Sequence, residues 1–474
     1  MYYSDYNIIV DLENYPAYSI IHNLFNGKIA LLPRTFASEL RKNAISNNGT
    51  LKNGNAYLYK YLKDNSFIYS SRTAENKKIA HAYSLFKKAV PSANPSRQYQ
   101  FIMTYQCNLS CVYCFQKKIR TKKKGYSFDR NMLNKAFEVI LDKERQNNVE
   151  AEKNELPYRR TLISLVGGEP LIDSSEQKKN ISYIVQFVKD NGFIYSITTN
   201  GVALGKFLPL FEKENLFPQN IQVTIDGTKE VHDKRRIGKN GASSFEKIIE
   251  SVDLILSNGG SISLRINLDD MNVDNLYKIG DFIYKKGWTK NKKFSAYLAP
   301  VTDHSLVNKN YKWINGDASL LKRILDLYKI YPELGDMFTM KNFRGFQYIK
   351  QLLSDDGKCV PTMWRCEAIL GQLIFDPAGD LYTCFEGAGN EKAKVGVYYP
   401  RLRVSSKLLE RWKLLNSFDN QFCKECSYKF ICAGGCPWYI IEQNKTECLP
   451  IKEELELAWN YFAEDIISRK LTAS

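Results

Sequence analysis

Three cysteines, Cys107, Cys111 and Cys114, stand close together, spaced by three and then two residues, directly after the apolar run Tyr99–Tyr105. Three thiolates on one loop cannot all pair as disulfides, but they can hold one metal cluster, as cysteine thiolates hold iron–sulfur clusters. A four-iron cluster held by three cysteines keeps one iron free for another ligand. A zinc site would need a fourth ligand nearby, and no His or Cys follows until His232. The spacing therefore favours an iron–sulfur cluster over zinc.

The chain around this triplet alternates between strand-like and helix-like segments. Six apolar runs are predicted as strands: Tyr99–Tyr105, Thr161–Val166, Phe193–Thr198, Ile221–Ile225, Ser261–Asn267 and Lys293–Ala299. Five stretches between them are predicted as helices: Arg130–Gln146, Gln177–Asn191, Lys206–Asn215, Ser244–Asn258 and Asn272–Lys286. This alternation predicts a parallel sheet. In barrels of this kind the carboxyl ends of the strands form the active-site face, and the cysteine triplet follows the first strand.

Polar and glycine residues stand at or after the ends of the next four strands. They are Gly167, Gly168, Glu169 and Pro170; Thr199 and Asn200; Thr224, Asp226 and Arg236; and Arg265. Two glycines let a ligand approach the backbone, and Glu169 offers a carboxylate to a cation. Each motif alone is weak, because such turns are often only turns. Their order at successive strand ends predicts one ligand pocket beside the triplet, whereas His232 alone is more often structural than catalytic.

Eight further cysteines lie in the last quarter of the chain: Cys359, Cys366, Cys384, Cys423, Cys426, Cys432, Cys436 and Cys448. A zinc ribbon is the alternative for Cys423, Cys426, Cys432 and Cys436. The triplet, the strand-end motifs and this tail together resemble the radical S-adenosylmethionine (SAM) enzymes that carry a C-terminal SPASM domain. The resemblance implies an α/β fold whose core is a partial (β/α)6 TIM-like barrel, followed by a cluster-binding tail.

The resemblance also implies the cofactors, which are SAM and three 4Fe-4S clusters. Cys107, Cys111 and Cys114 would hold the SAM-binding cluster. Two auxiliary clusters would take interleaved ligands: Cys359, Cys366, Cys384 and Cys436 for the first, and Cys423, Cys426, Cys432 and Cys448 for the second. Cys359 has the least fixed spacing, and without it the first auxiliary cluster would have an open iron that could bind substrate.

The same resemblance assigns the strand-end residues to SAM. The motif Gly167-Gly168-Glu169-Pro170 would meet the amino group of the methionine moiety. Thr199 and Thr224 would lie near the carboxylate or the ribose, and Arg236 and Arg265 are candidates for the carboxylate. Asn200 and Asp226 complete the predicted cofactor-binding set.

The chain is predicted to divide into four units, at residues 1–95, 96–305, 306–357 and 358–474. The first unit has strand-like runs at Tyr6–Leu12, Ala17–Leu24 and Lys28–Leu32, followed by helix-like segments. It resembles the small winged-helix-like domain that grips leader peptides in ribosomal-peptide (RiPP) maturation enzymes, where an extended peptide adds to a sheet edge. A generic cap on the barrel is the alternative. The run PSANP at residues 91–95 is predicted as a linker, and residues 306–357 connect the barrel to the tail.

Two enzymatic functions are compatible with this pattern. The first is a peptide maturase that abstracts hydrogen from a precursor peptide and oxidatively forms a thioether or carbon–carbon crosslink. The alternative is anaerobic sulfatase maturation, in which Cys or Ser becomes formylglycine. Those enzymes usually begin their triplet near the N-terminus and usually carry Asp after the cysteine equivalent to Cys384, where this chain has Phe385 and then Glu386. We therefore expect crosslinking, with Glu386 as a candidate base. A non-catalytic electron carrier is a third hypothesis, disfavoured because a carrier needs no SAM pocket.

The charge and the apolar runs of the chain limit which binding partners we expect. The net charge is +16, from 67 Lys and Arg against 51 Asp and Glu. The basic residues are spread along the chain, with local clusters such as Lys117–Lys124, so we expect a solvated basic surface, or a groove for an acidic peptide, and no nucleic acid. The N-terminus has no basic signal region and no run reaches eighteen apolar residues, so we expect a soluble, cytoplasmic protein without a membrane partner. The expected partners are a precursor peptide with a leader segment and an external electron donor such as flavodoxin or ferredoxin.

Overall fold

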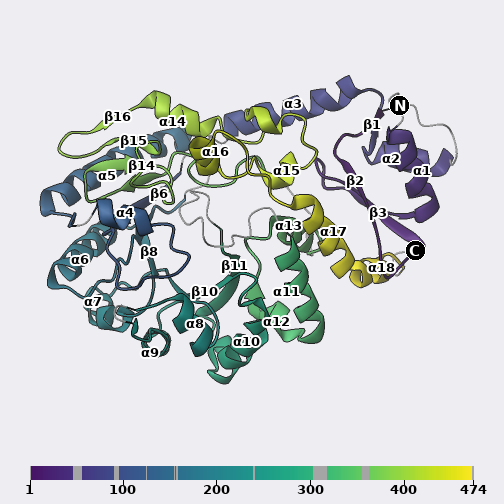
Figure 1. Ribbon diagram of the computed structural model, residues 1–474. Coiled ribbons are helices and arrows are strands. Elements are labelled where there is room, and N and C mark those ends of the chain that lie inside the picture. Colours follow the sequence, from purple (N-terminus) through teal and green to yellow (C-terminus); the bar gives the residue numbers. More distant parts are fainter. Residues whose placement is uncertain are drawn as a thin grey trace.

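The computed structural model describes residues 2–45, 56–89, 96–123, 125–153, 155, 159–238, 241–302, 318–354 and 362–471. Within these residues an eleven-stranded sheet runs through the molecule (Figure 1). Its centre is six parallel strands that neighbour one another in chain order: β6 (Gln98–Ile102), β7 (Leu162–Val166), β8 (Ile194–Thr199), β9 (Asn220–Ile225), β10 (Ile262–Leu268) and β11 (Phe294–Pro300). All six predicted strands are confirmed, although the first ends at Ile102 because the chain there turns into the cysteine loop.

Helices connect these strands and cover the outer face of the sheet (Figure 1). They are α4 (Lys117–Lys122), α5 (Arg130–Lys153), α6 (Ser175–Asp190), α7 (Leu208–Lys213), α8 (Lys229–Arg235), α9 (Phe245–Ser257) and α10 (Leu276–Lys285). Apolar residues recur on one face of each long helix, and in α9 the buried positions include Ile248, Val252 and Ile255. This spacing buries one stripe against the strands. The sequence predicted all of these helices except α4 and α8, which are short and lie next to the site.

The tail continues the sheet of the core. Strand β13 (Leu373–Phe375) pairs in parallel with β6, and β14 (Asp380–Tyr382), β15 (Lys394–Val397) and β16 (Arg403–Val404) follow antiparallel. At the other edge β12 (Phe338–Thr339) extends β11. The division at residues 305 and 358 remains a prediction, but the sheet itself is continuous across it.

The remaining helices of the C-terminal half pack beside the sheet. They are α11 (Ser319–Ile330), α12 (Glu333–Met337), α13 (Arg344–Leu352), α14 (Ser406–Lys413), α15 (Lys429–Cys432), α16 (Pro437–Gln443), α17 (Ile451–Tyr461) and α18 (Ala463–Leu471). Glu454 of α17 accepts a hydrogen bond from the backbone of Gly345 in α13, with N and Oε2 2.6 Å apart. Burial raises the pKa of Glu454 to about 7.

The N-terminal unit has its own small sheet, of β2 (Asn7–Asp11), β3 (Tyr18–Asn23) and β4 (Ile29–Pro33). Helices α1 (Arg34–Ile45), α2 (Ala56–Asp64) and α3 (Arg72–Ala89) follow, and β1 (Tyr2–Tyr3) pairs with β5 (Ile68–Tyr69). Three strands followed by helices confirm the predicted elements. The predicted linker at 91–95 lies outside the described residues.

This unit packs on the C-terminal half of the chain. The ring of Tyr83 in α3 stacks on Phe418, with centroids 4.3 Å apart. His22 of β3 stacks on Tyr348 and meets Trp459 edge-on. Burial lowers the pKa of His22 to about 3, so this contact is made by a neutral imidazole.

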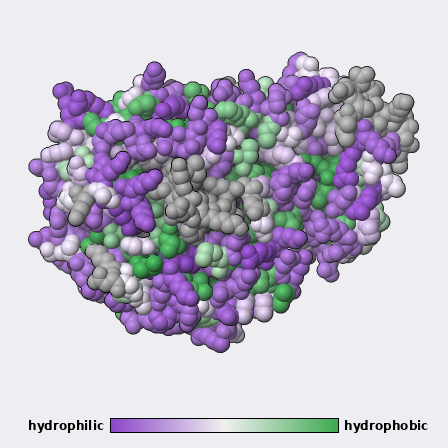
Figure 2. Space-filling view, viewed as in Figure 1, coloured by the Kyte–Doolittle hydropathy of each residue, from purple (hydrophilic) through white to green (hydrophobic). Residues whose placement is uncertain are grey.

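The surface in the view of Figure 2 is mainly polar, with apolar residues scattered between the charged ones. Among the helices of the described residues, none combines the length and the apolarity needed to span a bilayer.

A buried carboxylate fixes the amino-terminal end of the core sheet and gives a first prediction. Glu144 of α5 accepts hydrogen bonds from Arg97, Tyr99, Asn147 and Thr161, at 2.6 to 2.9 Å. Glu144→Ala would remove the carboxylate that balances the buried Arg97 charge. We expect a loss of about 3–5 kcal/mol in the free energy of unfolding, because one member of a buried pair is removed.

Urea unfolding followed by circular dichroism measures this loss. The matched control is Glu138→Ala on the same helix, whose side chain is 62% exposed and pairs with Lys135; it should change the free energy by less than about 0.5 kcal/mol. Equal losses in the two variants would contradict the role given to Glu144.

Candidate functional site

One cavity at the carboxyl ends of the core strands brings most of the predicted site residues together. Its volume is about 220 Å³. The predicted residues that line it are Cys107, Cys111, Cys114, Gly167, Gly168, Thr199, Asn200, Thr224, Arg236 and Arg265. Glu169, Pro170 and Asp226 are not among its lining residues. The cavity therefore joins the cysteine loop after β6 to residues at the ends of β7, β8, β9 and β10.

The cysteine loop is held by hydrogen bonds to its sulfurs and carbonyls. The guanidinium of Arg120 in α4 donates to the Sγ of Cys114 at 3.0 Å and to the carbonyl of Leu109 at 2.7 Å. The Asn200 amide donates to the Sγ of Cys107 at 3.6 Å. Burial raises the pKa of Cys107, against the opposing charge of Arg120, and raises the pKa of Cys111 to about 12. Three thiolates in this place would therefore need a compensating cation.

The donor set suits a cluster better than a single ion. Among the described residues, no three Cys, His, Asp or Glu side chains converge closely enough to hold one metal ion. The three thiols instead surround a shared cavity, as ligands to different irons of a cluster would. Buried Nε atoms of Arg120 and Arg236 have no hydrogen-bond partner within the described part of the chain. These donors fit a ligand that brings acceptor atoms, such as a carboxylate.

The two glycines after β7 are required by the protein backbone itself. Gly167 has a φ of +150°, and a Cβ on Gly168 would overlap the carbonyl oxygens of Gln106 and Tyr105. The amides of Gly168 and Glu169 donate to the carbonyls of Thr104 and Gln106, each at 2.8 Å. Both glycines also line the cavity, so they admit the cysteine loop on one side and leave room for a ligand on the other.

Glu169 joins three loops and is 1% exposed. Its carboxylate accepts hydrogen bonds from the amide of Leu171 at 2.8 Å, the hydroxyl of Thr199 at 2.6 Å and the amide of Asn200 at 2.6 Å. Burial raises the pKa of Glu169, and these hydrogen bonds oppose the shift. The structure thus places the Glu169 carboxylate behind the cavity wall, where it orients Thr199 and Asn200. Pro170 is also behind the wall, its carbonyl accepting from Gln177 at 2.6 Å.

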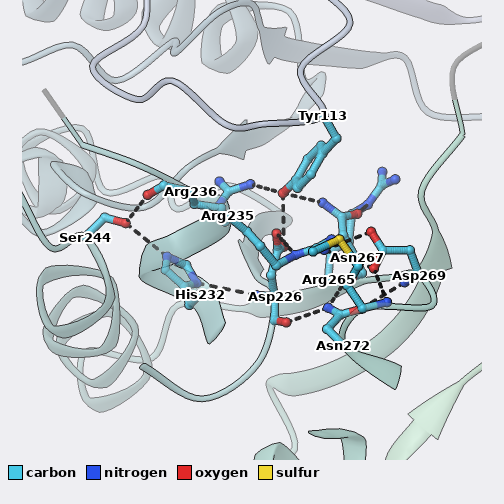
Figure 3. A network of polar contacts seen from close by, with 11 residues as sticks. Tyr113, Asp226, His232, Arg235, Arg236, Ser244, Arg265, Asn267, Asp269 and Asn272 are labelled. Carbon is cyan, nitrogen blue, oxygen red and sulfur yellow. Dashed lines mark hydrogen bonds and ion pairs between the residues drawn. The ribbon is translucent and has the colours of Figure 1, made fainter. Parts of the chain in front are cut away.

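Tyr113, inside the cysteine triplet, is the centre of a polar network (Figure 3). Its hydroxyl accepts hydrogen bonds from Arg236 at 2.8 Å and Asn267 at 2.9 Å, and donates to Asp226 at 3.0 Å. Burial raises the pKa of Tyr113 well above its ordinary value, so the hydroxyl keeps its proton. The network ties the ends of β9 and β10 to the triplet.

Asp226 connects the Tyr113 hydroxyl to a buried ion pair. It is fully buried and pairs with the Nε of Arg235 at 3.2 Å, and Arg235 also pairs with Asp269 at 2.8 Å. His232 accepts from the Asp226 amide at 3.4 Å, and its Nε2 lies 3.0 Å from the Ser244 hydroxyl. Burial lowers the pKa of His232 to about 3, so it is a neutral structural residue (Figure 3).

Several lining residues were not predicted from the sequence: Tyr113, Phe115, Gln116, Arg120, Thr198, Gln222, Asn267, Val301, Thr302 and Phe385. Tyr113 stands within the triplet and Arg120 within the basic run after it, so position relative to the cysteines was the available signal. Phe385 of the tail packs edge-on against Phe115, with ring centroids 5.7 Å apart. Glu386 does not line the cavity and remains a predicted base.

The tail cysteines fall into two neighbourhoods. The pKa of Cys384 is raised by burial and then by Cys436, Glu386 and Cys366. The pKa of Cys423 is raised by burial to about 11, with further effects from Cys432, Cys426 and Cys448. These neighbours match the two predicted ligand sets, although the ligand roles remain a prediction. Cys359 lies outside the described residues, and the ten described cysteines form no disulfide among themselves.

Residues 101–283, which include the triplet and every strand-end motif, match the family model of the Radical SAM superfamily. The chain therefore carries a Radical SAM domain. The radical SAM family implies one 4Fe-4S cluster and SAM, and the cavity between the three thiols and the strand ends is the place that fits them.

Known proteins extend the likeness beyond this segment. The cysteine-type anaerobic sulfatase-maturating enzyme of Clostridium novyi (strain NT) is 27% identical over 351 residues, which cover 70% of this chain and 84% of that protein. Native anSMEcpe, solved with bound AdoMet and the Cp18Cys peptide, has a TM-score of 0.56 at 16% identity and covers 80% of this chain and 99% of its own. Streptococcus suis SuiB, solved with its precursor peptide SuiA, has a TM-score of 0.55 at 14% identity and covers 95% and 98%. The two structures confirm the predicted α/β radical SAM fold.

The Tyr113 network gives a second prediction. Tyr113→Phe would remove the hydroxyl shared by Arg236, Asn267 and Asp226 and leave buried polar groups with one partner fewer, at a cost of about 1–3 kcal/mol. Since Arg236 lines the cavity, we expect SAM to bind about five- to fifty-fold more weakly, measured by equilibrium dialysis on anaerobically reconstituted protein.

The control is Tyr195→Phe, which removes a buried hydroxyl that donates to the carbonyl of Leu216 at 2.7 Å, near the amino-terminal end of β8. It should leave SAM affinity unchanged. Unchanged affinity in Tyr113→Phe as well would mean that the network does not position Arg236 for the ligand.

Proposed function

We propose that this protein oxidises a cysteine side chain within a peptide or protein to formylglycine, the reaction that a resemblance to sulfatase-maturating enzymes implies. The observation that carries the proposal is the likeness to the C. novyi enzyme over 70% of this chain. The fold likeness to anSMEcpe, which was solved with both AdoMet and a peptide bound, also supports a peptide substrate. The sequence alone favoured crosslinking, with sulfatase maturation as the alternative; the comparisons favour the alternative.

The residues of the cavity have separable tasks in this proposal. Cys107, Cys111 and Cys114 would hold the cluster through their thiolates. When bound, the cluster and SAM supply a radical that removes hydrogen from an unactivated carbon. Arg236 and Arg265, which line the cavity, would present positive charge to the carboxylate of SAM.

The tail supplies the second half of the oxidation. We assign two auxiliary 4Fe-4S clusters to the cysteine neighbourhoods of the tail, where they would accept one electron from the substrate. For a cysteine substrate, Cβ would lose one hydrogen atom and the thiol one proton, and an auxiliary cluster would supply the acceptor for the remaining electron. Water would then replace sulfur to give the aldehyde and sulfide. The step needs a proton acceptor, and the described residues that line the cavity include no carboxylate. Glu386, next to the lining residue Phe385, is the nearest candidate along the chain.

Crosslinking of a ribosomally made peptide is the second candidate, and one observation favours it. The anSMEcpe structure covers 80% of this chain, whereas SuiB covers 95%. The β2–β3–β4 sheet of the N-terminal unit has two edge strands, and an edge strand can pair with an extended peptide. In this candidate, a leader segment would pair with one of these edge strands.

A peptide assay separates the two candidates. Anaerobic enzyme, SAM and dithionite are incubated with a sulfatase-type peptide containing one cysteine, and products are analysed by mass spectrometry. We expect 5′-deoxyadenosine together with a product that reacts with a hydrazine probe for aldehydes. The matched peptide with Ala in place of the cysteine should give no aldehyde.

Two results would go against formylglycine formation. One is a hydrogen-depleted product without an aldehyde, found with a precursor-type peptide only, which supports crosslinking. The other is the absence of 5′-deoxyadenosine with every peptide, which contradicts both candidates.

A further inference from the structure

We propose that Arg120 raises the reduction potential of the cluster held by the cysteine triplet, and that the tail keeps Arg120 in place through Lys123. The inference rests on the cluster that the radical SAM family implies, and it is independent of which residue of a peptide is oxidised. Both residues belong to the basic run Lys117–Lys124, for which the sequence predicted only a solvated basic surface. Arg120 lies in α4, and Lys123 directly follows that helix.

The guanidinium of Arg120 contacts the cysteine loop at two points. One of its terminal nitrogens donates to the Sγ of Cys114 at 3.0 Å, and the other donates to the carbonyl of Leu109 at 2.7 Å. Arg120 also lines the cavity of about 220 Å³ that fits the cluster and SAM. The cysteine loop therefore holds the guanidinium with its charge at the edge of the cluster site.

The positive charge of Arg120 also acts on a second cysteine. Burial raises the pKa of Cys107, and Arg120 is the main influence that opposes this rise, whereas Glu169 adds to it. For Cys111, burial again raises the pKa, and the opposing charge is that of Arg236. Arg120 therefore combines a hydrogen bond to one cysteine sulfur with a favourable charge beside another.

Such a contact favours the reduced form of a cluster. Reduction adds one electron, and hence one unit of negative charge, and no atom is transferred. Hydrogen bonds to the cysteine sulfurs, net charge and solvent exposure set the reduction potential of iron–sulfur clusters. A fixed cation stabilises the more negative state more strongly, and Arg120 is half-buried, so water screens its charge only in part. We therefore expect Arg120 to make this cluster easier to reduce.

Two acids of the tail hold the end of α4. The Nζ of Lys123 pairs with the carboxylates of Asp376 at 3.6 Å and Asp380 at 3.0 Å. The Lys123 side chain is 17% exposed and that of Asp376 is fully buried, so this ion pair is largely shielded from water. Burial lowers the pKa of Lys123, but the two carboxylates outweigh this effect and raise the pKa overall. The ammonium group therefore stays charged.

Asp376 contacts the chain on both sides of the triplet. Besides Lys123, it receives a hydrogen bond from the hydroxyl of Tyr105 at 2.9 Å. Tyr105 stands two residues before Cys107, and Lys123 stands three residues after Arg120, so residues 106–122 between them contain the whole triplet and Arg120. Helix α4 accordingly lies beside β14 of the tail (Figure 1). One buried carboxylate of the tail thus fixes this segment before and after the cluster site.

The test compares Arg120→Gln with Lys118→Gln. Lys118 is exposed on the same helix, and its replacement removes the same charge two residues away, so a general effect of net charge would appear in both variants. The proteins are reconstituted anaerobically, and the potential is measured without SAM by redox titration followed by electron paramagnetic resonance. The signal of the triplet cluster is the one that Cys107→Ala/Cys111→Ala/Cys114→Ala lacks. Iron quantification shows whether each variant retains its cluster.

We expect the potential to fall by about 59 mV or more in Arg120→Gln, which is a tenfold change in the equilibrium constant for one-electron reduction, and to stay unchanged in Lys118→Gln. Arg120→Lys keeps the positive charge and should give an intermediate potential. Lys123→Gln should lower the potential in the same direction, because α4 loses its ion pairs with the tail while Arg120 is still present.

An unchanged potential in Arg120→Gln, or an equal fall in Lys118→Gln, would overturn the proposal; an unchanged potential with weaker SAM binding would assign Arg120 to SAM instead. If Arg120→Gln retains no cluster, Arg120→Lys decides: a lower potential supports the proposal and an unchanged one overturns it. An unchanged potential in Lys123→Gln would overturn the part assigned to the tail. Absence of the triplet signal from the unmodified protein would contradict the cluster itself.

Discussion

The carboxylate of Glu169 is the constraint on which the site depends. It receives the Thr199 hydroxyl and the amides of Leu171 and Asn200, and so fixes the loops after β7 and β8 to each other. Its own amide donates to the Gln106 carbonyl, one residue before Cys107. The loop after β7 therefore contacts the loop after β8 through the Glu169 carboxylate and the cysteine loop through the Glu169 amide. Gly167 and Gly168 make this approach possible, because any side chain there would displace the cysteine loop.

Asp226, a second buried acid, likewise connects separate loops, on the other side of the cavity. Asp226 and Asp269 hold Arg235, and Asp226 also receives the hydroxyl of Tyr113. Buried ion pairs are costly to desolvate, and this one keeps Arg236 and the triplet in a fixed relation. Two acidic residues that the sequence predicted as cofactor contacts thus act from behind the wall, while glycine, hydroxyl, amide and guanidinium groups face the cavity.

The alternation of strands and helices could be predicted because each core strand is an apolar run between amphipathic helices. The cysteine triplet and the strand-end motifs could be placed together because the carboxyl ends of parallel strands share one edge. The pairing of β6 with β13 could not, because β13 is only three residues long and lies far along the chain. The sequence likewise could not locate Phe385 in the cavity wall, since that contact crosses between two distant segments. The sequence favoured crosslinking because the triplet begins late in the chain and Phe385 follows Cys384, whereas the comparisons favour sulfatase maturation.

The central claim is that the triplet and the two tail neighbourhoods each hold one four-iron cluster. Anaerobic iron quantification on reconstituted protein, made beside the Cys107→Ala/Cys111→Ala/Cys114→Ala variant, tests it most directly. Three such clusters predict about twelve irons per chain, falling to about eight in the variant. About four irons, all lost in the variant, would mean that the tail holds no cluster and that the proposed oxidation lacks its electron acceptor.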